Sequence, residues 1–406
     1  MKNKVSREAL SGIKVADFGQ FGVGPWTCKH MADHGAEVVH VESNTHVDAL
    51  RSAPPFKGSP GINRSLYFAQ YNNNKYGVTL NLRHPKGVEV AKRIIKWADV
   101  VVENHRAGMM DELGLGYEAL RKLKPEIIML SSCSQGQTGP YATRQALGTQ
   151  ITALGGFLYV TGWPDRYPSP PYAAYTDTVV PQFNVVAILA ALSFRDKTGE
   201  GMFIDSSQVE VGINFLAPLA LDYMANGRIA ERDGNRSPSA APHGVYRCLG
   251  EDRWCTISVS QADWPRFRKA IGDPAWTKSA TFSTFLSRKE NEDELNKLVE
   301  GWTSRLAPEE VMRRMQAAGV AAGIVQNCQD LSRDPQLQYR KLATELEHPE
   351  IGKHNYYRAA FTLSETPAEI NRPGCCIGEH NDYFYTQVLG ISESEFVQLL
   401  NEGVFD

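Results

Sequence analysis

Residues 15–25 read VADFGQFGVGP, and this stretch decides the fold. A short β-prone run at residues 15–18 passes into a loop with three glycines, and Pro25 stands where a helix can begin. Proline suits a first helical turn because its ring fixes φ and its missing N–H has no intrahelical partner there. The stretch therefore predicts a strand that enters a helix through a tight turn.

The same alternation of strand and helix continues along the chain. Further β-prone runs lie at residues 37–41, 77–82, 100–103, 127–131 and 202–205. Helix-like stretches separate several of these runs, including a continuous apolar helix predicted at residues 181–194. Alternation of this kind is typical of an α/β fold, in which helices cover a mostly parallel sheet.

A second unit is expected after residue 227. The chain there becomes polar and rich in glycine and proline (GRIAERDGNRSPSAAPHG), which is typical of a linker. A strand at residues 254–260 and a charged amphipathic helix at residues 288–306 then indicate a smaller α+β region. A length of 406 residues also favours two domains over one.

Composition excludes several classes of function. Lys and Arg (43) nearly balance Asp and Glu (46), so no global basic field is available to hold nucleic acid or an anionic membrane. The longest strongly apolar run, residues 185–192, is shorter than the roughly 20 residues that cross a bilayer. Residues 1–12 lack the apolar segment of a secretory signal. We expect a cytoplasmic protein that binds neither nucleic acid nor membrane.

The glycine loop at residues 17–25 partly matches a dinucleotide site, because Glu42 ends the next strand about twenty residues on. Its glycines follow the order G-x-x-G-x-G, whereas the dinucleotide fingerprint is G-x-G-x-x-G, and Pro25 occupies the helix start. An NAD(P)-binding oxidoreductase therefore stays as an alternative. A plain tight turn, or a site for another phosphate-bearing ligand, is equally open.

Basic residues gather around the first four β/α connections, where they either neutralise a nucleotide or only solvate helix faces. Asp177 stands apart, because AAYTDTVV at residues 173–180 embeds one carboxylate among small and apolar residues just before the predicted buried helix. Such a carboxylate either caps the helix or is a partly desolvated reactive group. The basic residues are Lys75, Arg83, Lys86, Arg106, Arg121, Lys122 and Lys124.

Several segments, in one order and over nearly the whole chain, resemble the class III CoA-transferase family. This family includes formyl-CoA and carnitine CoA-transferases and the related α-methylacyl-CoA racemases. The segments are residues 10–25 (LSGIKVADFGQFGVGP), 36–42, 72–82 (NNNKYGVTLNL), 98–118 (ADVVVENHRAGMMDELGLGYE), 136–141 (GQTGPY), Asp177, 188–207, 234–246 (GNRSPSAAPHGVY) and 378–380 (GEH).

The resemblance implies a Rossmann-like large domain with a smaller α+β domain, in subunits that interlock as a dimer. The large CoA-binding domain would comprise residues 1–225 completed by 335–406, and residues 226–334 would form the small domain with its linkers. It further implies an acyl-CoA:carboxylate CoA-transferase that takes a coenzyme A thioester as substrate, without a metal or a permanently bound cofactor. The enzyme would be a homodimer or a heterodimer with a related subunit.

Positions matched to the family imply the site residues. Arg106 is the expected phosphate partner because a guanidinium pairs bidentately with phosphate oxygens. Two basic positions of formyl-CoA transferase are Ser43 and Glu112 here, so the phosphate contacts differ from that enzyme. The implied CoA contacts are Gly22, Val23, Leu80, Asn104, His105 and Arg106.

Asp177 aligns with the family's nucleophilic aspartate. The resemblance implies that its carboxylate attacks the donor thioester, giving an acyl-aspartyl anhydride and CoA thiolate, and that the thiolate returns to form an aspartyl-CoA thioester. The acceptor carboxylate then repeats the sequence. Both intermediates are sensitive to water, so an apolar setting for Asp177 protects them from hydrolysis.

Alternatives on the same scaffold remain. An acyl-CoA racemase needs two titratable groups, but residues 146–149 read ALGT where that branch has a His-Asp pair. A non-catalytic partner subunit is disfavoured because Asp177 is retained. The missing glycine-rich loop of formyl-CoA transferase argues against formate and oxalate as substrates.

Residues 100–118 resemble the branch in which succinyl-CoA donates CoA to benzylsuccinate in anaerobic aromatic degradation. That branch implies an aryl-substituted acid as acceptor. Aromatic side chains that precede Asp177 either line a pocket for such an acid or serve ordinary packing. They are Trp163, Tyr167, Tyr172 and Tyr175.

Overall fold

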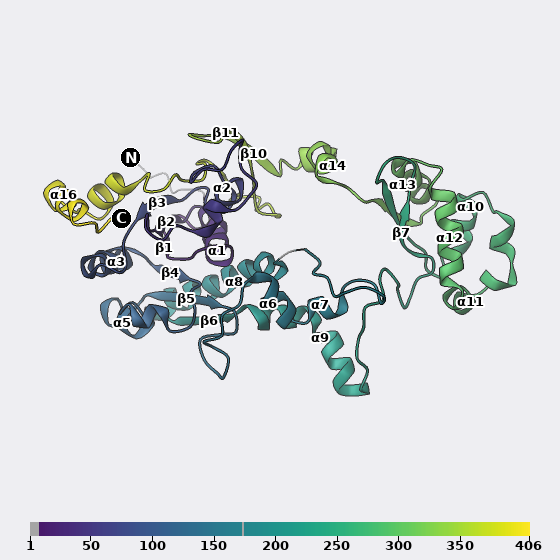
Figure 1. Cartoon of the computed structure of the whole chain (residues 1–406), viewed down its shortest axis with the longest axis horizontal. Helices are drawn as coiled ribbons and strands as arrows, with labels where there is room; N and C mark the ends of the chain where they lie inside the picture. Colours follow the sequence, from purple (N-terminus) through teal and green to yellow (C-terminus); the bar gives the residue numbers. More distant parts are fainter. Residues whose placement is uncertain (1–7, 173) are drawn as a thin grey trace. The chain divides into compact units, whose positions relative to one another are not determined.

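The computed structural model describes residues 8–172 and 174–406. Contacts divide the chain into two compact units (Figure 1). Unit 1 contains the chain up to Tyr159 together with Ser169–Ala230 and Lys341–Asp406, and unit 2 contains Val160–Pro168 and Glu231–Arg340.

A six-stranded parallel sheet forms the centre of unit 1, in the order β3-β2-β1-β4-β5-β6 (Figure 1). The predicted α/β fold with a parallel sheet is therefore confirmed. The strand order reverses between β1 and β4, and a parallel sheet opens a crevice for ligands at the carboxyl ends beside such a reversal. The strands are β1 (Lys14–Asp17), β2 (Glu37–Glu42), β3 (Tyr76–Thr79), β4 (Val100–Glu103), β5 (Ile128–Cys133) and β6 (Phe203–Ser207).

Helices cover both faces of this sheet, which explains why β1 to β5 are buried along nearly their whole length, whereas the edge strand β6 is partly exposed. Side chains alternate between the faces: Val100 and Val102 pack with α1 and α8, whereas Val101 packs with α3 and α5. The helices of unit 1 are α1 (Val23–Asp33), α2 (Leu66–Tyr71), α3 (Pro85–Trp97), α4 (Met109–Glu112), α5 (Tyr117–Leu123), α6 (Gly148–Leu154), α7 (Phe157–Val160), which ends at the boundary of unit 2, α8 (Tyr175–Thr198), α9 (Gln208–Asn226) and α16 (Glu393–Asn401), with the short turns η1 (Ala49–Ser52) and η4 (Tyr383–Val388).

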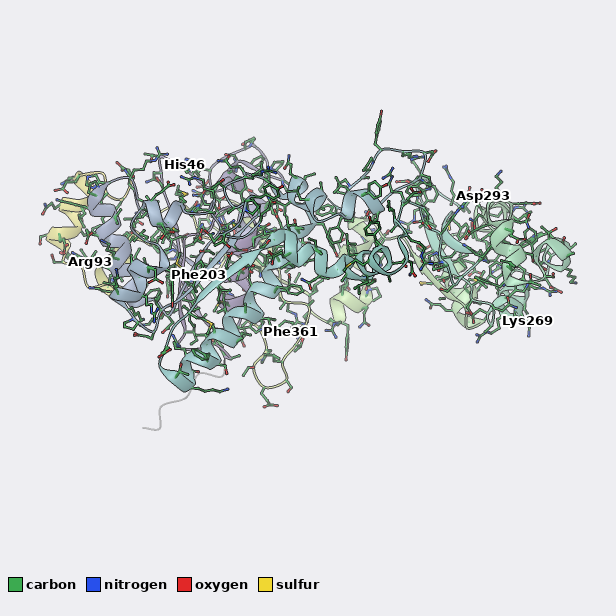
Figure 2. The ribbon with its side chains drawn as sticks, turned by 90° about the horizontal axis from the view of Figure 1, so that it is seen from below. His46, Arg93, Phe203, Lys269, Asp293 and Phe361 are labelled. Atoms are coloured by element: carbon green, nitrogen blue, oxygen red, sulfur yellow. The ribbon has the colours of Figure 1, made fainter. Side chains whose placement is uncertain are left out.

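The C-terminal segment returns to unit 1. It contributes the hairpin β10 (Ala343–His348) and β11 (Gly352–Tyr357) and then α16, which packs beside α3 (Figure 2). Arg93 of α3 donates to Glu395 of α16 at 2.7 Å, and the Asn81 N–H donates to the carbonyl of Val404 at 2.8 Å. The last residues of the chain thus pack on the same face of the sheet as α3.

Helix α8 begins six residues before its predicted start at residue 181. Asp177 therefore lies in its first turn, and not ahead of the helix as the sequence suggested. By length and composition α8 is also long and apolar enough to cross a bilayer, which the sequence analysis missed because it counted only residues 185–192. One such helix is weak evidence for a membrane span, and Ile188 and Leu192 are buried in the core of unit 1.

In unit 2, helices and shorter turns pack around a three-stranded antiparallel sheet in the order β7-β8-β9. The predicted helix at residues 288–306 is two helices, because Asn291 ends α11 and precedes α12. The elements are β7 (His243–Arg247), β8 (Trp254–Ser258), α10 (Trp264–Ala270), η2 (Ala275–Lys278), η3 (Ala280–Phe282), α11 (Phe285–Glu290), α12 (Glu292–Thr303), α13 (Pro308–Ala317), β9 (Ala321–Ile324), α14 (Cys328–Arg333) and α15 (Pro335–Tyr339).

Residues 160–168 belong to unit 2, although the sequence analysis placed them in the large domain. The N–H of Gly234 donates to the carbonyl of Gly162 at 2.9 Å, and Gly234 lies against the ring of Trp163. These contacts connect the segment to residues far along the chain, which a local pattern does not reveal.

Candidate active site

A cavity of about 420 Å³ opens in unit 1 where the carboxyl ends of β1 and β4 meet the first turn of α8. Its walls come from the loops after β1 and β4, the segment 142–148 and the starts of α8 and α9. Most of the predicted site residues line this one cavity. They are Gly22, Val23, Asn104, His105, Arg106 and Asp177.

Leu80, the remaining predicted contact, is buried in the wall of a neighbouring cavity of about 170 Å³. Arg83 and Ser43 line that cavity too. The two cavities share lining residues, among them Gln20 and His105. The structure thus brings the predicted residues together at adjoining sites on the carboxyl edge of the sheet.

Asp177 presents a carboxylate without a partner. No side-chain capping hydrogen bond is present at the start of α8, whose N-cap is Ala174, so the capping interpretation of Asp177 is wrong. Among the described residues none donates a hydrogen bond to its carboxylate, and burial raises the pKa of Asp177 to about 6. A partly desolvated, unpaired carboxylate is the form expected of a reactive group.

Glycines leave the space around this carboxylate open. A Cβ on Gly22 would lie 3.4 Å from Oδ2 of Asp177, and a Cβ on Gly148 would lie 2.6 Å from the same oxygen. The second distance is far below van der Waals contact. Glycine at these two positions therefore gives a bound molecule access to the carboxylate.

Buried side chains hold the loop that faces Asp177. The Gln20 N–H donates to Oδ1 of Asn104 at 2.8 Å, and Nδ2 of Asn104 donates back to the Gln20 carbonyl at 2.8 Å. The Phe21 N–H donates to Oδ2 of Asp48 at 3.0 Å, which holds Phe21 at a positive φ of 58°. Asn104 thus shapes the loop in addition to lining the cavity, and Asp48 is a supporting residue that the sequence analysis missed.

The next N–H groups of the loop stay free. In the described part of the chain no acceptor takes the N–H groups of Gly22, Val23 or Gly24, which begin α1. A helix N-terminus carries unsatisfied donors and partial positive charge. Donors fixed in this way can stabilise an oxyanion that forms at Asp177 or on a molecule bound to it.

Comparison with known proteins identifies the chain. The family model described as CoA-transferase family III matches residues 10–381. The chain belongs to this family. It is therefore an acyl-CoA:carboxylate CoA-transferase, whose chemistry uses a CoA thioester as substrate and no permanently bound cofactor.

Two curated relatives are similar to this transferase along its whole length. The succinyl-CoA–D-citramalate CoA-transferase of Chloroflexus aurantiacus is 31% identical over 96% of this chain and 96% of its own. The beta subunit of succinyl-CoA–L-malate CoA-transferase from the same organism is 29% identical over 97% of this chain and 98% of its own. The crystal structure of a CAIB/BAIF family protein from Brucella suis matches with a TM-score of 0.87 at 29% identity, over 94% of this chain and all of that one.

In this structure of the transferase, Arg106 is already paired and is not free to bind a phosphate group. Arg106 is 41% exposed and its guanidinium makes a two-point ion pair with Glu112. His105 carries no compensating charge at neutral pH, because burial lowers the pKa of its imidazole. A phosphate group must therefore compete with Glu112 for Arg106.

The basic residues near the β/α connections take different roles in the transferase. Lys75 is fully buried and donates to Asp17 at 2.8 Å, so it supports the core and is not available to a nucleotide. Lys86 pairs with Glu402 at the surface. Arg83 is the member of this set that lines the cavity with Leu80.

The described lining of the cavity of Asp177 contains none of the four aromatic side chains considered from the sequence. Trp163 and Tyr167 belong to unit 2, and Tyr167 is 93% exposed. Tyr175 packs edge-on against Phe157 at 5.1 Å between ring centres. Phe21 is the aromatic side chain that the described lining does contain.

Sequence reasoning also missed three polar side chains in the cavity of Asp177. Arg144 and Gln145 follow the GQTGPY segment, and Gln208 opens α9. The signal for Arg144 was its position three residues after a family segment. Residues 8–172 and 174–406 contain no cluster of three or more His, Cys, Asp or Glu placed to bind a metal ion.

Proposed function

We propose that Asp177 is the nucleophile of a transferase that moves CoA from succinyl-CoA to a dicarboxylic acid. The observation that carries this proposal is the unpaired, partly buried carboxylate of Asp177, which lies beside Gly22 in the cavity that most of the predicted CoA contacts line. The names of the relatives, which act on succinyl-CoA with citramalate or malate, support the donor and the class of acceptor.

The reaction proceeds through two exchanges at Asp177. Its carboxylate oxygen attacks the thioester carbonyl, the C–S bond breaks, and CoA leaves as a thiolate from an acyl-aspartyl anhydride. The thiolate then attacks the aspartyl carbonyl, which releases succinate and leaves an aspartyl-CoA thioester. The acceptor carboxylate attacks this thioester to form a second anhydride, and the thiolate returns to the acceptor acyl carbon and frees Asp177.

Each step forms a tetrahedral oxyanion beside α1. The free N–H groups of Gly22 and Val23 are the donors we assign to it, because the loop is already fixed by Asn104 and Asp48 and need not reorganise. Burial keeps bulk water from the anhydride and thioester. Removal of one donor of this type typically costs about 100-fold to 1000-fold in kcat.

The adjoining cavities suggest how CoA binds. We place the adenosine end against Leu80 and His105 in the smaller cavity, with Arg83 and Arg106 as phosphate partners. The pantetheine arm then reaches Asp177 past Gln20, which lines both cavities. Guanidinium groups suit this role because they pair bidentately with phosphate oxygens.

A second subunit is part of the proposal. The outer faces of α8 and α9 expose apolar side chains, Met224 being 80% exposed, and patches of this kind mark association surfaces. We propose that a second copy of this chain or a related subunit covers them in an interlocked dimer, and that the enzyme is cytoplasmic. The exposed apolar side chains are Phe183, Val186, Leu189, Phe194, Ile213, Phe215, Leu219, Leu221, Tyr223 and Met224.

An acceptor panel tests the proposed function. The enzyme is incubated with succinyl-CoA and either malate, citramalate, glutarate, benzylsuccinate or benzoate, and new thioesters are read by mass spectrometry. We expect transfer to dicarboxylic acids, with benzylsuccinate reporting whether an aryl substituent is accepted. Hydroxylamine added during turnover should mark the Asp177 peptide. Absence of transfer to every acid, with no modified Asp177, would contradict the proposal.

The pH dependence of the rate follows from the pKa of Asp177. Only the ionised carboxylate attacks, so kcat/KM should rise with pH through about 6 and level off above about 7. A profile of kcat/KM between pH 5 and 8 measures this rise. Burial also raises the pKa of Asp48 to about 6, so the Asp48→Asn variant is the control. In this variant kcat/KM should be lower at every pH but should still rise through about pH 6. A flat profile in the wild type would contradict the assignment.

A further inference from the structure

Gln208 has an unsatisfied amide oxygen in the wall of the cavity of Asp177. It opens α9, is only 5% exposed and lines the cavity. Its Oε1 is buried, and no residue that the structure describes donates to it. A buried acceptor without a donor is unfavourable, because it has lost its hydrogen bond to water. This oxygen therefore indicates a donor that reaches it only when the cavity is occupied.

Arg144, an exposed residue that lines the same cavity, supplies donors for which the described residues offer no acceptor. Its guanidinium lies on the ring of Tyr141 at 3.7 Å, and within residues 8–172 and 174–406 no carboxylate pairs with it. The other lining guanidinium, Arg106, is already held by Glu112. Asp177 is the single carboxylate of the described lining, so no other carboxylate of that lining competes for Arg144.

Ser134 connects these two residues at the end of β5. Its carbonyl accepts the Val209 N–H at 3.0 Å, which fixes the start of α9 beside Gln208. Its Oγ donates to the carbonyl of Arg144 at 3.4 Å. Arg144 and Gln208 therefore extend from a common point of the cavity wall.

We propose that Arg144 and Gln208 form a subsite for the second carboxylate of a dicarboxylic substrate. On binding, the guanidinium turns from Tyr141 into the cavity, donates to Oε1 of Gln208 with one edge and grips the remote carboxylate with the other. Arginine has the five donors that this double contact needs. This inference rests on the proposed function, because it assumes that the reacting carbonyl of the same substrate lies at Asp177.

Charge explains why the subsite is needed. The succinyl group of the donor brings its free carboxylate into a cavity that already holds the ionised Asp177, and the two negative charges repel each other in a partly desolvated space. Arg144 offsets this repulsion only for substrates that carry the remote carboxylate. The donor acyl group and the acceptor occupy the subsite in turn, since both react at the side chain of Asp177, which is a carboxylate for the donor and a CoA thioester for the acceptor.

Binding of succinate and butyrate to the CoA-loaded enzyme tests the subsite by calorimetry. Both acids have four carbons, and only succinate has a second carboxylate. In Arg144→Gln we expect the succinate Kd to rise at least tenfold, while the Kd values of butyrate and CoA stay within twofold. Gln208→Met should raise the succinate Kd three- to fivefold. Arg121→Gln, which removes an exposed arginine of α5, is the matched control and should change none of them.

Kinetics provide a second readout. With succinyl-CoA as donor, kcat/KM for glutarate should fall at least tenfold more than that for pentanoate in Arg144→Gln. Equal losses of kcat/KM for mono- and dicarboxylic acids in Arg144→Gln would overturn the subsite. A raised Kd for CoA would also overturn it, because Arg144 would then be a phosphate contact. A failure of the proposed function would give a different result. The wild-type enzyme would then bind succinate through Arg144 but would transfer CoA to no acid.

Discussion

Replacing Asp177 by asparagine is expected to abolish CoA transfer and to leave CoA binding within about twofold of wild type. The amide keeps the shape of the side chain but cannot attack a thioester, and loss of a nucleophile costs on the order of 10⁴- to 10⁶-fold in kcat. The CoA contacts we assign come from other residues, so the nucleotide end is unaffected. Steady-state turnover and calorimetric titration with CoA measure the two quantities.

The same variant should be more stable than the wild type at neutral pH. The pKa of Asp177 is about 6 in the folded chain, above its ordinary value of 3.8, so the folded state favours the protonated carboxyl. Stability is therefore lost as pH rises from about 4 to about 6, and asparagine removes this loss. Denaturant unfolding should show a gain of up to about 3 kcal/mol at pH 8 and none at pH 4.

Asp196→Asn is the matched control, because Asp196 lies on the same helix and is largely exposed. It should keep wild-type turnover and wild-type stability at both pH values. Near-normal transfer by Asp177→Asn would contradict the nucleophile assignment. A lower stability of Asp177→Asn at pH 8 would contradict the argument that the ionised carboxylate of Asp177 destabilises the folded chain.

Much of the sheet could be predicted because its information is local. Buried strands are short apolar runs, and the glycines and Pro25 mark the turn into α1, so β1, β4 and β5 lie within about two residues of their predicted positions. The family segments also name residues that gather at one cavity. These features depend on neighbours in the chain or on matched motifs.

The supporting residues could not be predicted because they act across long separations. Asp48 meets Phe21 across 27 residues, and Asn104 meets Gln20 across 84. Gln208 enters the cavity only because β6 pairs with β5 and ends beside Ser134. No periodicity or motif reports such contacts. The choice between a cap and a reactive group at Asp177 likewise depends on which donors the fold brings near it.

The second large effect is expected at Gly148, the first residue of α6. A Cβ there would lie 2.2 Å from the Cβ of Ala174 and 2.6 Å from Oδ2 of Asp177. Ala174 is the N-cap of α8, so Gly148→Ala must move either the start of α8 or the segment that carries Gly148. Displacement of a reacting group by about 1 Å costs roughly 100-fold in rate. We expect a loss of that size in kcat, with the Kd of CoA within about threefold of wild type.

Single-turnover and steady-state kinetics of Gly148→Ala, with the CoA titration alongside, check this expectation. Gly301→Ala is the matched control: Gly301 lies in α12 and a Cβ there meets no atom within 4 Å. Alanine favours a helix interior over glycine, so the control should gain about 0.5–1 kcal/mol of stability and keep its activity. A wild-type kcat in Gly148→Ala would contradict this expectation. It would mean that the segment with Gly148 shifts without moving the Asp177 carboxylate, so that close packing at Gly148 does not fix the position of that carboxylate.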